Sequence, residues 1–454
     1  MTDNKLQQNK QLQTESEDKQ QKKQSSDLLK EYGGFNAVMG IIPDAADMNP
    51  RDKAAKTIFL TEEQYKNKRK RLANELAGWL NILKEEKNSV TEYADLCDQK
   101  KDEYQELLKE NIKTATEKIK RLEISYRNLD AFFKNAGIDK ITNIRFFNAE
   151  KFDEENKDSK ELASSDSDSV KEIKDIIHRA FDRLSLKENY SILVMPGFIF
   201  KDKQIRDLWA EIAFEHRILL VTDHADCNKY EDMFEQTENY KDTDMKLQNV
   251  IVTANWLVGR NAEALAEERN PLYIPPSGAL AGKLYNPNIP ISQGAAGEKY
   301  GTLSEIKGVH VDMLKTEITS LWDNKIIPMV FSEGRVMAFN NTNLYNGDLT
   351  AMRDYPIVRV FDWVKKNLVH YVHKIAMENW DPYNSPDKLK ETIQSFLNDY
   401  KGYGKLFEDY TIGDPIQDEK TKEIKIDINL KPFFAAKNFT IQLSSKNKKT
   451  DQVN

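Results

Sequence analysis

Residues 190–227 read YSILVMPGFIFKDKQIRDLWAEIAFEHRILLVTDHADC, and the order of patterns in this stretch decides the fold. Its first part, Tyr190–Met195, is an apolar run ended by a Pro-Gly pair, which is typical of a buried strand. Lys203–Glu215 then predicts a helix, and Arg217–Thr222 predicts a second strand. A strand, a helix and a strand at this spacing predict a right-handed βαβ unit in a mainly parallel sheet.

The same alternation continues on both sides of this stretch. Upstream, Ile141–Phe147 predicts a strand and Val170–Leu184 an amphipathic helix. Downstream, Lys229–Tyr240 predicts a helix and Asn249–Thr253 a further strand. We therefore expect a fold of mixed α/β and α+β class, with a central sheet of βαβ type.

The pattern changes after Pro275. Pro and Gly residues are frequent as far as about Gly301, which predicts a loop-rich segment. Helices and strands are then expected at Val311–Asp323 (helix), Ile326–Phe331 and Gly334–Asn340 (a hairpin-like pair), Val358–Glu378 and Pro386–Tyr400 (helices), and Glu423–Leu430 and Asn438–Ser444 (alternating strands).

The N-terminal sixty residues carry little that could form a core. Residues 1–30 are almost devoid of apolar side chains, and we expect a disordered tail because burial cannot offset the entropy of ordering. Residues 31–60 are expected to form an extended arm with two short apolar segments, Tyr32–Ile42 and Thr57–Leu60. An apolar strand without a local partner must pair with a distant strand or with another chain's sheet.

Residues 61–136 have a helical pattern in two parts, the first ending near residues 87–89 and the second near Gly137, which supplies a C-cap. Apolar residues of the second helix step alternately by four and three positions, as in a coiled-coil seam: Leu108, Ile112, Ala115, Ile119, Leu122, Tyr126, Leu129 and Phe133. A helical hairpin docked on the body and an interchain coiled coil are both open. The expected division is completed by an α/β domain at 137–300, a C-terminal domain at 301–444 and a polar tail at 445–454.

Composition narrows the function classes. The 454 residues have room for two or three domains of about 150 residues each. With 67 Lys and Arg against 74 Asp and Glu, the net charge of −7 gives no reason to expect nucleic acid as a partner. No stretch approaches the ~20 apolar residues that span a bilayer, so no membrane insertion is expected. Two cysteines, Cys97 and Cys227, indicate a reducing compartment rather than a disulfide framework.

One group of residues could bind a metal or act in catalysis, and we call it the candidate cluster. It lies at the end of the strand Arg217–Thr222. Asp223, His224, Asp226 and Cys227 are metal-ligand types, but their spacing matches no known metal motif, and a hydrogen-bonded loop is the favoured interpretation. His370 and His373 lie three apart on a helix, where zinc sites use a spacing of four. No phosphate-binding glycine motif follows a strand. We therefore expect no catalytic residue, no cofactor and no metal.

Read in order, the second half of the chain resembles the contractile tail-sheath superfamily. The segments that carry the resemblance are Tyr190–Gly197 (YSILVMPG), Ile274–Gly282 (IPPSGALAG), Leu321–Phe339 (LWDNKIIPMVFSEGRVMAF), Tyr355–Trp363 (YPIVRVFDW), Glu378–Tyr383 (ENWDPY) and Phe433–Leu443 (FFAAKNFTIQL). The Pro-Pro-Ser-Gly segment is the most specific of them. Within that superfamily the whole chain resembles the large sheath subunit of type VI secretion systems (TssC/VipB-like).

The resemblance implies a structural protein of the bacterial cytoplasm and a set of partners. These are a small sheath subunit (TssB/VipA-like), copies of the chain itself in a helical sheath, an inner tube of hexameric rings (Hcp-like), a baseplate, and an AAA+ unfoldase that recycles the contracted sheath. Two alternatives remain: a phage or phage-like tail sheath, and a nucleotide- or metal-dependent α/β enzyme. Co-purification with a small sheath protein distinguishes the first, and a cofactor-binding assay distinguishes the second.

Three groups of residues are expected to serve assembly. The apolar positions of the terminal arms are predicted to pair with strands of neighbouring subunits: Phe439, Ile441, Leu443, Val38 and Ile41. The charged face of Pro386–Tyr400, with Lys388, Lys390 and Glu391, is predicted to contact the inner tube. A structural loop is predicted at Pro275, Pro276, Ser277, Gly278 and Gly282, because prolines fix φ and glycines allow unusual backbone conformations.

Overall fold

The computed structural model describes residues 74–137, 141–147, 164–198, 203–373 and 385–434, apart from 75, 79, 82–83, 85–89, 142, 238–239, 419 and 421–422. The chain divides into two compact units, Met1–Ile112 and Lys113–Asn454. In the first unit the described part is helical, and its longest element is the beginning of α5 (Val90–Ala136). In the described part of the chain, no helix combines the length and the apolarity needed to cross a bilayer.

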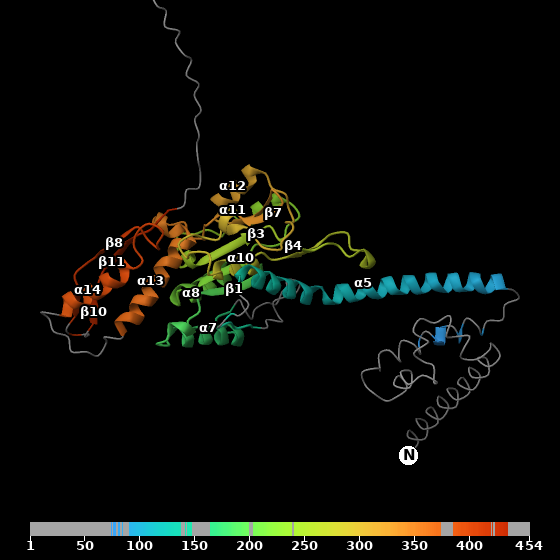
Figure 1. The fold of residues 1–454 in the computed structure, drawn as a ribbon, viewed down its shortest axis with the longest axis horizontal. Coiled ribbons are helices and arrows are strands. Elements are labelled where there is room, and N and C mark those ends of the chain that lie inside the picture. The colour runs from blue at the N-terminus through green and yellow to red at the C-terminus, as the bar shows by residue number, and fades with distance from the viewer. Residues whose placement is uncertain are drawn as a thin grey trace, which may run out of the picture. The chain divides into compact units, whose positions relative to one another are not determined.

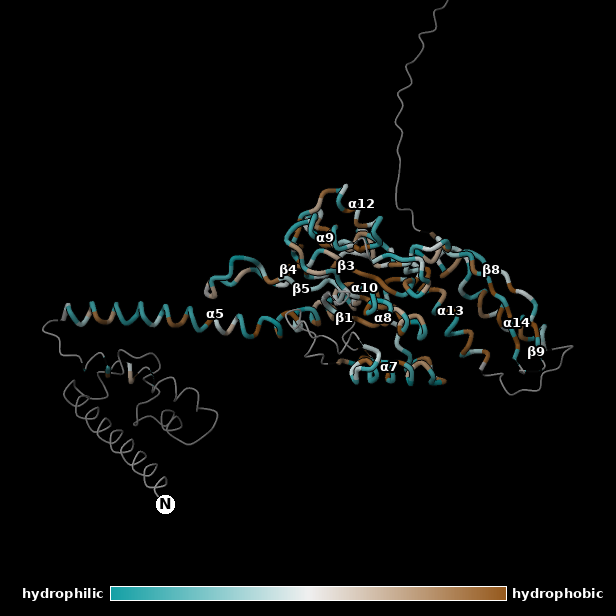
Figure 2. Tube along the Cα trace, turned by 180° about the vertical axis from the view of Figure 1, so that it is seen from behind, coloured by the Kyte–Doolittle hydropathy of each residue, from teal (hydrophilic) through white to brown (hydrophobic). Residues whose placement is uncertain are grey.

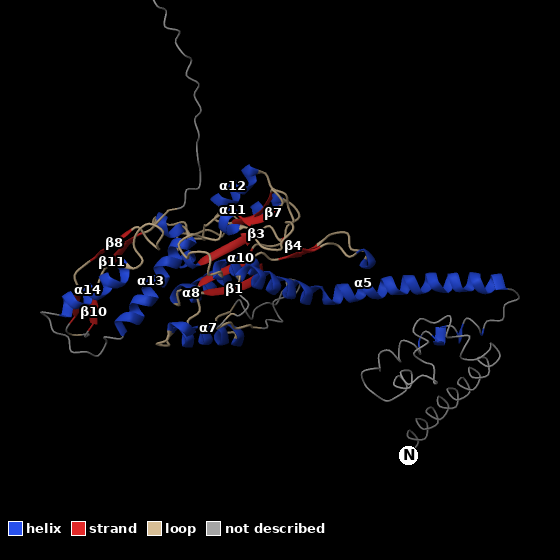
Figure 3. Ribbon diagram, in the orientation of Figure 1, coloured by secondary structure: helices blue, strands red, loops and turns tan. Residues whose placement is uncertain are grey.

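The second unit is built on a five-stranded sheet (Figures 1 and 3). The strand order is β1 (Ile192–Phe198), β2 (Leu219–Asp223), β3 (Val250–Ala254), β6 (Ile327–Ser332) and β7 (Arg335–Ala338). The first four strands are parallel and β7 is antiparallel to β6. These strands and α8 (Lys203–Glu215), between β1 and β2, confirm the predicted βαβ unit and the mixed fold class.

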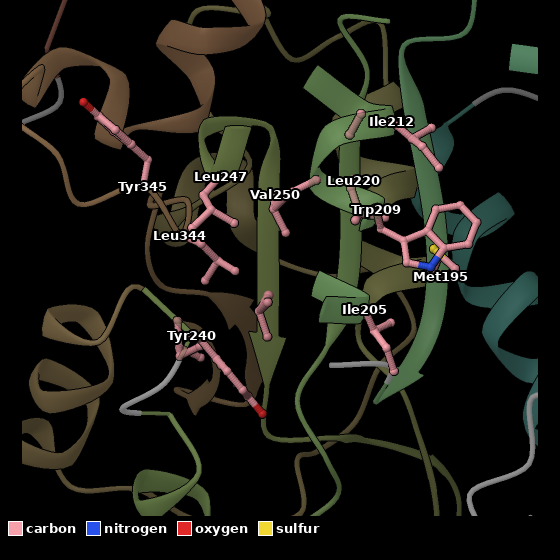
Figure 4. Packing of buried hydrophobic residues seen from close by; sticks show 14 of the residues in the cluster. Met195, Ile205, Trp209, Ile212, Leu220, Tyr240, Leu247, Val250, Leu344 and Tyr345 are labelled. Atoms are coloured by element: carbon pink, nitrogen blue, oxygen red, sulfur yellow. The ribbon is translucent and has the colours of Figure 1, made fainter. Parts of the chain in front are cut away.

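Alternate residues of the central strands serve two separate cores. Leu220 of β2 and Val250 of β3 point to the face covered by α8 and α7 (Asp168–Phe181). Figure 4 shows part of this core, with Trp209 of α8 lying beside Met195 of β1. Leu219 and Ile251 point instead to the face covered by α10 (Ser277–Tyr285) and the end of α5. Because both faces are covered, β2 and β3 are buried along their whole length and consist mainly of apolar residues, as is typical of parallel strands.

Smaller elements surround this sheet: α9 (Tyr230–Glu235), α11 (Gly297–Gly301), α12 (Lys315–Asp323), and an antiparallel pair formed by β4 (Leu257–Arg260) and β5 (Leu272–Ile274). The sequence did not predict β4 and β5. Figure 2 shows hydrophobic residues concentrated in the central strands, such as β3.

The C-terminal part has its own core. The helices α13 (Tyr355–His373) and α14 (Ser385–Asn398) pack through Val364, Leu368 and Ile393. A long antiparallel hairpin covers them, consisting of β8 (Asp409–Ile412), β9 (Ile416–Asp418), β10 (Glu423–Lys425) and β11 (Ile428–Lys431). The predicted strand Glu423–Leu430 is therefore interrupted, and its partners are β8 and β9, which the sequence did not predict.

The prediction of a strand at Ile141–Phe147 is wrong. The described residues of this segment form no ladder. The side chains of Ile144, Phe146 and Phe147 are exposed, so the apolar pattern that favours a strand is not used to build the core here. Asn143 has a φ of 61°, which interrupts extended backbone.

Candidate functional site

The carboxyl end of the parallel sheet is where α/β proteins commonly bind ligands, and here it is filled by the protein's own carboxylate. Asp223, the last residue of β2, is fully buried. Its Oδ1 accepts hydrogen bonds from the Ser277 N–H at 2.7 Å and the Thr253 hydroxyl at 2.5 Å. Its Oδ2 accepts from the Ser277 hydroxyl at 2.5 Å and the Gly197 N–H at 2.8 Å. Burial raises the pKa of Asp223 to about 6, while these four donors act in the opposite direction.

The position of Asp223 is that of an anion at a helix N-terminus. Ser277 is the first residue of α10, so the carboxylate neutralises the positive end of that helix. Gly197 has a φ of 92° at an irregularity in β1, which turns its N–H toward the carboxylate. The arrangement ties β1, β2, β3 and α10 together at one point.

The other three residues of the candidate cluster have hydrogen-bond partners other than Asp223, and His224 and Cys227 share one of them, the Ala225 carbonyl oxygen. His224 Nδ1 lies 2.9 Å from the Ala225 carbonyl oxygen, and Asp226 lies 2.7 Å from His310 Nδ1. The Cys227 thiol lies 3.5 Å from the Ala225 carbonyl, and burial raises its pKa to about 11. Nowhere in the described ranges do three His, Cys, Asp or Glu side chains gather to hold a metal ion. The cluster is thus a hydrogen-bonded strand end, the interpretation favoured by its spacing.

The predicted loop at Pro275–Gly282 is wrong in its secondary structure. Pro275 and Pro276 precede a helix, α10, in which Ser277, Gly278 and Gly282 are all buried. Neither glycine has a positive φ. The reason given for them, access to unusual backbone conformations, is therefore also incorrect.

The two glycines instead allow α10 and α5 to approach closely. A Cβ at Gly278 would lie 2.3 Å from Asn128 Oδ1, and one at Gly282 would lie 2.3 Å from the Phe132 carbonyl oxygen. Positions four apart share one helix face, so both glycines face α5. Asn128 Nδ2 also donates to the Pro275 carbonyl at 2.7 Å. Backbone proximity and a buried hydrogen bond thus fix α5 on the body.

Charged residues hold α5 from another side. Glu123 accepts from Arg260 of β4 at 2.7 Å and from Arg127 at 2.8 Å. Arg260 also pairs with Glu268, and Arg127 donates to the Gly259 carbonyl at 3.2 Å. Hydrogen bonds from Arg260 lower the pKa of both Glu123 and Glu268. These pairs are only partly exposed, so they fix geometry more firmly than surface pairs do.

Comparison with protein families identifies the family of this chain. Models of the TssC/VipB family match three successive parts: the N-terminal region at residues 22–112, the type VI secretion system central domain at 114–346, and the C-terminal domain at 354–454. The chain belongs to the TssC/VipB family. It is a large sheath subunit of a type VI secretion system, as the resemblance of the whole chain predicts. No curated protein matches the sequence.

Solved structures with similarity to this TssC/VipB chain include contractile sheaths. The contracted helical sheath of the anti-feeding prophage is 14% identical, with 70% of this chain and 81% of that chain covered and a TM-score of 0.47. The contracted sheath of an extracellular contractile injection system (PVC) is 15% identical, with 56% and 71% covered and a TM-score of 0.42. A sheath tail protein of Desulfitobacterium hafniense is 13% identical, with 54% and 56% covered and a TM-score of 0.33.

The apolar seam of α5 points away from the packed surface of this helix. Seven of its eight residues are exposed, and six of these are large: Leu108, Ile119, Leu122, Tyr126, Leu129 and Phe133. The residues of α5 that face the body are others, among them Asn128, Ala131 and Asn135. The spacing of the seam identified the exposed face of the helix. The buried face contains polar residues, and nothing in the sequence indicated that they would pack against the body.

The three residues predicted to contact the inner tube lie on α14. Lys388 and Glu391 are exposed on the side opposite Leu389 and Ile393, which pack into the C-terminal core. Lys390 pairs with Asp414 at 2.7 Å and is less available. The structure brings the three together on one helix of this TssC/VipB chain and leaves their role as a prediction.

The residues predicted to pair with neighbouring subunits lie outside the described residues: Val38, Ile41, Phe439, Ile441 and Leu443. What is described beside them in sequence is the hairpin of β8–β11. Its residues Ile412, Ile426 and Ile428 face α13 and α14, while Ile416 and Ile424 are exposed. Within the described part, each of its two ladders has two strands.

Gly278→Val and Gly282→Val are expected to abolish soluble, folded protein. A valine side chain at either position overlaps backbone or Asn128 of α5, at a cost of at least about 2 kcal/mol. Soluble yield and thermal unfolding measure the effect. The control is Gly413→Ala, because a Cβ there meets nothing closer than 3.5 Å and should leave the melting temperature unchanged. Normal unfolding of both valine variants would contradict the close-approach role.

The contact between α5 and β4 is expected to loosen in acid. The folded-state pKa of Glu123 and of Glu268 is lower than the ordinary 4.5, so their stabilising contribution is present above that value and is lost as the pH falls below it. Hydrogen exchange of residues 257–268, followed from about pH 6 to about pH 3, should accelerate beyond its intrinsic pH dependence. Arg260→Gln should exchange faster already at neutral pH and lose that extra dependence; an unchanged profile in this variant would reject the assignment.

Proposed function

We propose that this chain forms, together with a small sheath subunit, the wall of a cytoplasmic contractile sheath that surrounds an inner tube. Copies polymerise from a baseplate in a strained, extended state, and contraction drives the tube outward. An AAA+ unfoldase then recycles the contracted sheath. The chain acts by assembly and needs no catalytic group.

The observation that carries this proposal is the β8–β11 hairpin. One face of it packs on α13 and α14, and among the described residues each of its ladders has two strands, so that main-chain groups at their edges can accept further strands. Strand addition satisfies such groups and joins neighbouring subunits through their backbones. The terminal arms, with Ile441 and Val38 among their apolar positions, are the strands proposed to add.

The exposed seam of α5 is the proposed contact with the small subunit. Six large apolar side chains in a coiled-coil spacing favour a second helix as their cover. Such packing is non-directional and independent of the hydrogen bonds that fix the opposite face of α5. A phage-like sheath made of one protein is the second candidate, and the absence of a small partner in purified tubes would favour it.

Ile441→Asp is expected to abolish sheath tubes while the chain still purifies with the small subunit. The substitution puts a charge on the apolar side of a strand that alternates Phe439, Ile441 and Leu443 with polar residues. Electron microscopy of the co-expressed pair measures tube formation. Gln442→Asp, on the polar side, is the matched control and should form tubes. Contraction-competent tubes with Ile441→Asp would reject strand addition by this arm.

Lys388→Glu is expected to reduce occupancy of the sheath by the inner tube without affecting folding. The side chain is exposed on α14, and opposite charges across a sliding interface give weak, reversible contacts. Occupancy is counted in micrographs of sheaths assembled with tube protein. Lys405→Glu, also exposed but outside α14, serves as the control. Equal occupancy in both variants and the wild type would remove α14 from the tube contact.

A further inference from the structure

Three cations surround one carboxylate where α13 crosses the starts of the parallel strands. Asp362, Lys365 and Lys366 lie on α13, and Arg217 lies just before β2. Arg217 approaches Asp362 to 3.7 Å, and Lys366 Nζ donates to the Tyr190 carbonyl at 2.9 Å. We call Arg217, Lys365 and Lys366 the basic cluster. Counting Asp362, its formal charge is 3 − 1 = +2.

The carboxylate in this group is already engaged. Asp362 accepts from Asn249 Nδ2 at 2.7 Å in addition to its approach to Arg217. For Lys365, no hydrogen-bond or ion-pair partner lies in the described ranges. Glu215, two residues before Arg217, lies 3.8 Å from a different lysine, Lys174. The single negative charge of Asp362 therefore does not neutralise the three positive charges of the basic cluster.

Burial increases the energetic cost of the positive charges that Asp362 does not neutralise. Burial lowers the pKa of Lys366 to about 8; the charge of Asp362 acts against this change and that of Arg217 adds to it. Burial and Arg217 likewise lower the pKa of Lys365. Lys366 and Arg217, which are partly buried, gain more from an added anion than an exposed cation such as Lys365 does.

The backbone at Arg217 is a separate observation. Arg217 has a φ of 54°, and the next residue, Ile218, donates its N–H to the Ala213 carbonyl at 2.9 Å across the end of α8. Glycine is the usual residue at this place in a helix C-cap. Here the position holds an arginine whose guanidinium lies 4.7 Å over Phe214 and reaches Asp362. A strained position that carries a long charged side chain points to a function for that side chain.

We propose that the basic cluster binds a carboxylate side chain of a second copy of this chain in the assembled sheath. The inference rests on the proposed assembly from copies. Each copy carries seven more acidic than basic residues, so a neighbouring copy supplies the missing charge. Asp362 stands within the group and repels a multiply charged phosphate more strongly than a single carboxylate.

Zero-length cross-linking with a carbodiimide tests the contact directly. Sheaths are assembled from a mixture of unlabelled and 15N-labelled chain with the small subunit, cross-linked, and analysed by mass spectrometry. Lys365 is expected to be joined to an Asp or Glu in peptide pairs of mixed isotope, which only two copies can produce. Links from Lys365 solely within one copy, solely to the small subunit, or to nothing would overturn the proposal.

Two substitutions test the contribution to assembly. Arg217→Gly removes the charge at a position whose backbone suits glycine, and Lys365→Gln removes an exposed charge. Each is expected to raise the protein concentration needed for tubes by about fivefold at low salt, and to weaken its dependence on salt. Lys187→Gln, exposed and outside the cluster, is the control.

The outcomes distinguish a failure of the proposed function from a failure of the proposed contact at the basic cluster. Wild-type chain that forms no tubes with the small subunit would contradict the proposed function and this inference with it. Wild-type tubes without the mixed-isotope link at Lys365, or Arg217→Gly tubes with unchanged concentration and salt dependence, would contradict the basic cluster alone.

Discussion

The rest of the second unit depends on the hydrogen bonds of one buried carboxylate. Asp223 joins the ends of three parallel strands to the first turn of α10 through four donors. A buried charge without a cation is stable only if its hydrogen bonds are made, so each of these groups must stay in place. The direction of α10 is thereby fixed, and α10 in turn fixes α5 through the two glycines that face it.

This chain of contacts assigns structural partners to a strand end that is rich in ligand-type residues. In a nucleotide-binding α/β protein the helix N-terminus faces a phosphate. Here Asp223 takes that place, and Asp226 is occupied by His310. The polar groups that bind a cofactor elsewhere are used to join the sheet to the helix that holds α5.

The sequence was sufficient to predict the central strands and was insufficient for α10. The strand β3 was recognisable because a strand covered on both faces is mainly apolar, and four of the five buried residues Val250–Ala254 are apolar. In α10 the prolines and glycines favour a loop, since helix propensity is low at each of them. The helix forms because Asp223 stabilises its N-terminus and because α5 needs the space of two missing side chains. Both causes are tertiary contacts from residues more than 50 positions away.

The proposed assembly surfaces also divide into parts that the sequence predicts and parts that it does not. The seam of α5 was predictable because its spacing repeats over many turns. Glu423–Leu430 was predicted as one strand because its apolar residues alternate throughout, although the structure pairs it as two short strands, β10 and β11, with β9 and β8. Nothing in the sequence indicated the basic cluster. Arg217 and Lys365 are 148 positions apart and come close only because α13 crosses the sheet.

The inner face of α5 contacts its neighbours through close backbone approach and hydrogen bonds, whereas the outer face offers apolar side chains to its proposed partner. This difference bears on how a sheath can change shape. The inner face is fixed by backbone approach at Gly282 and by the hydrogen bond from Asn128, which tolerate one geometry. The outer seam offers apolar contacts, whose free energy depends on area rather than on angle. A rearrangement of subunits that shifts a partner helix along the seam costs less than one that moves α5 relative to α10. We infer that the end of α5 that carries Asn128 and Phe132 keeps its place on α10 while a partner helix shifts along the seam.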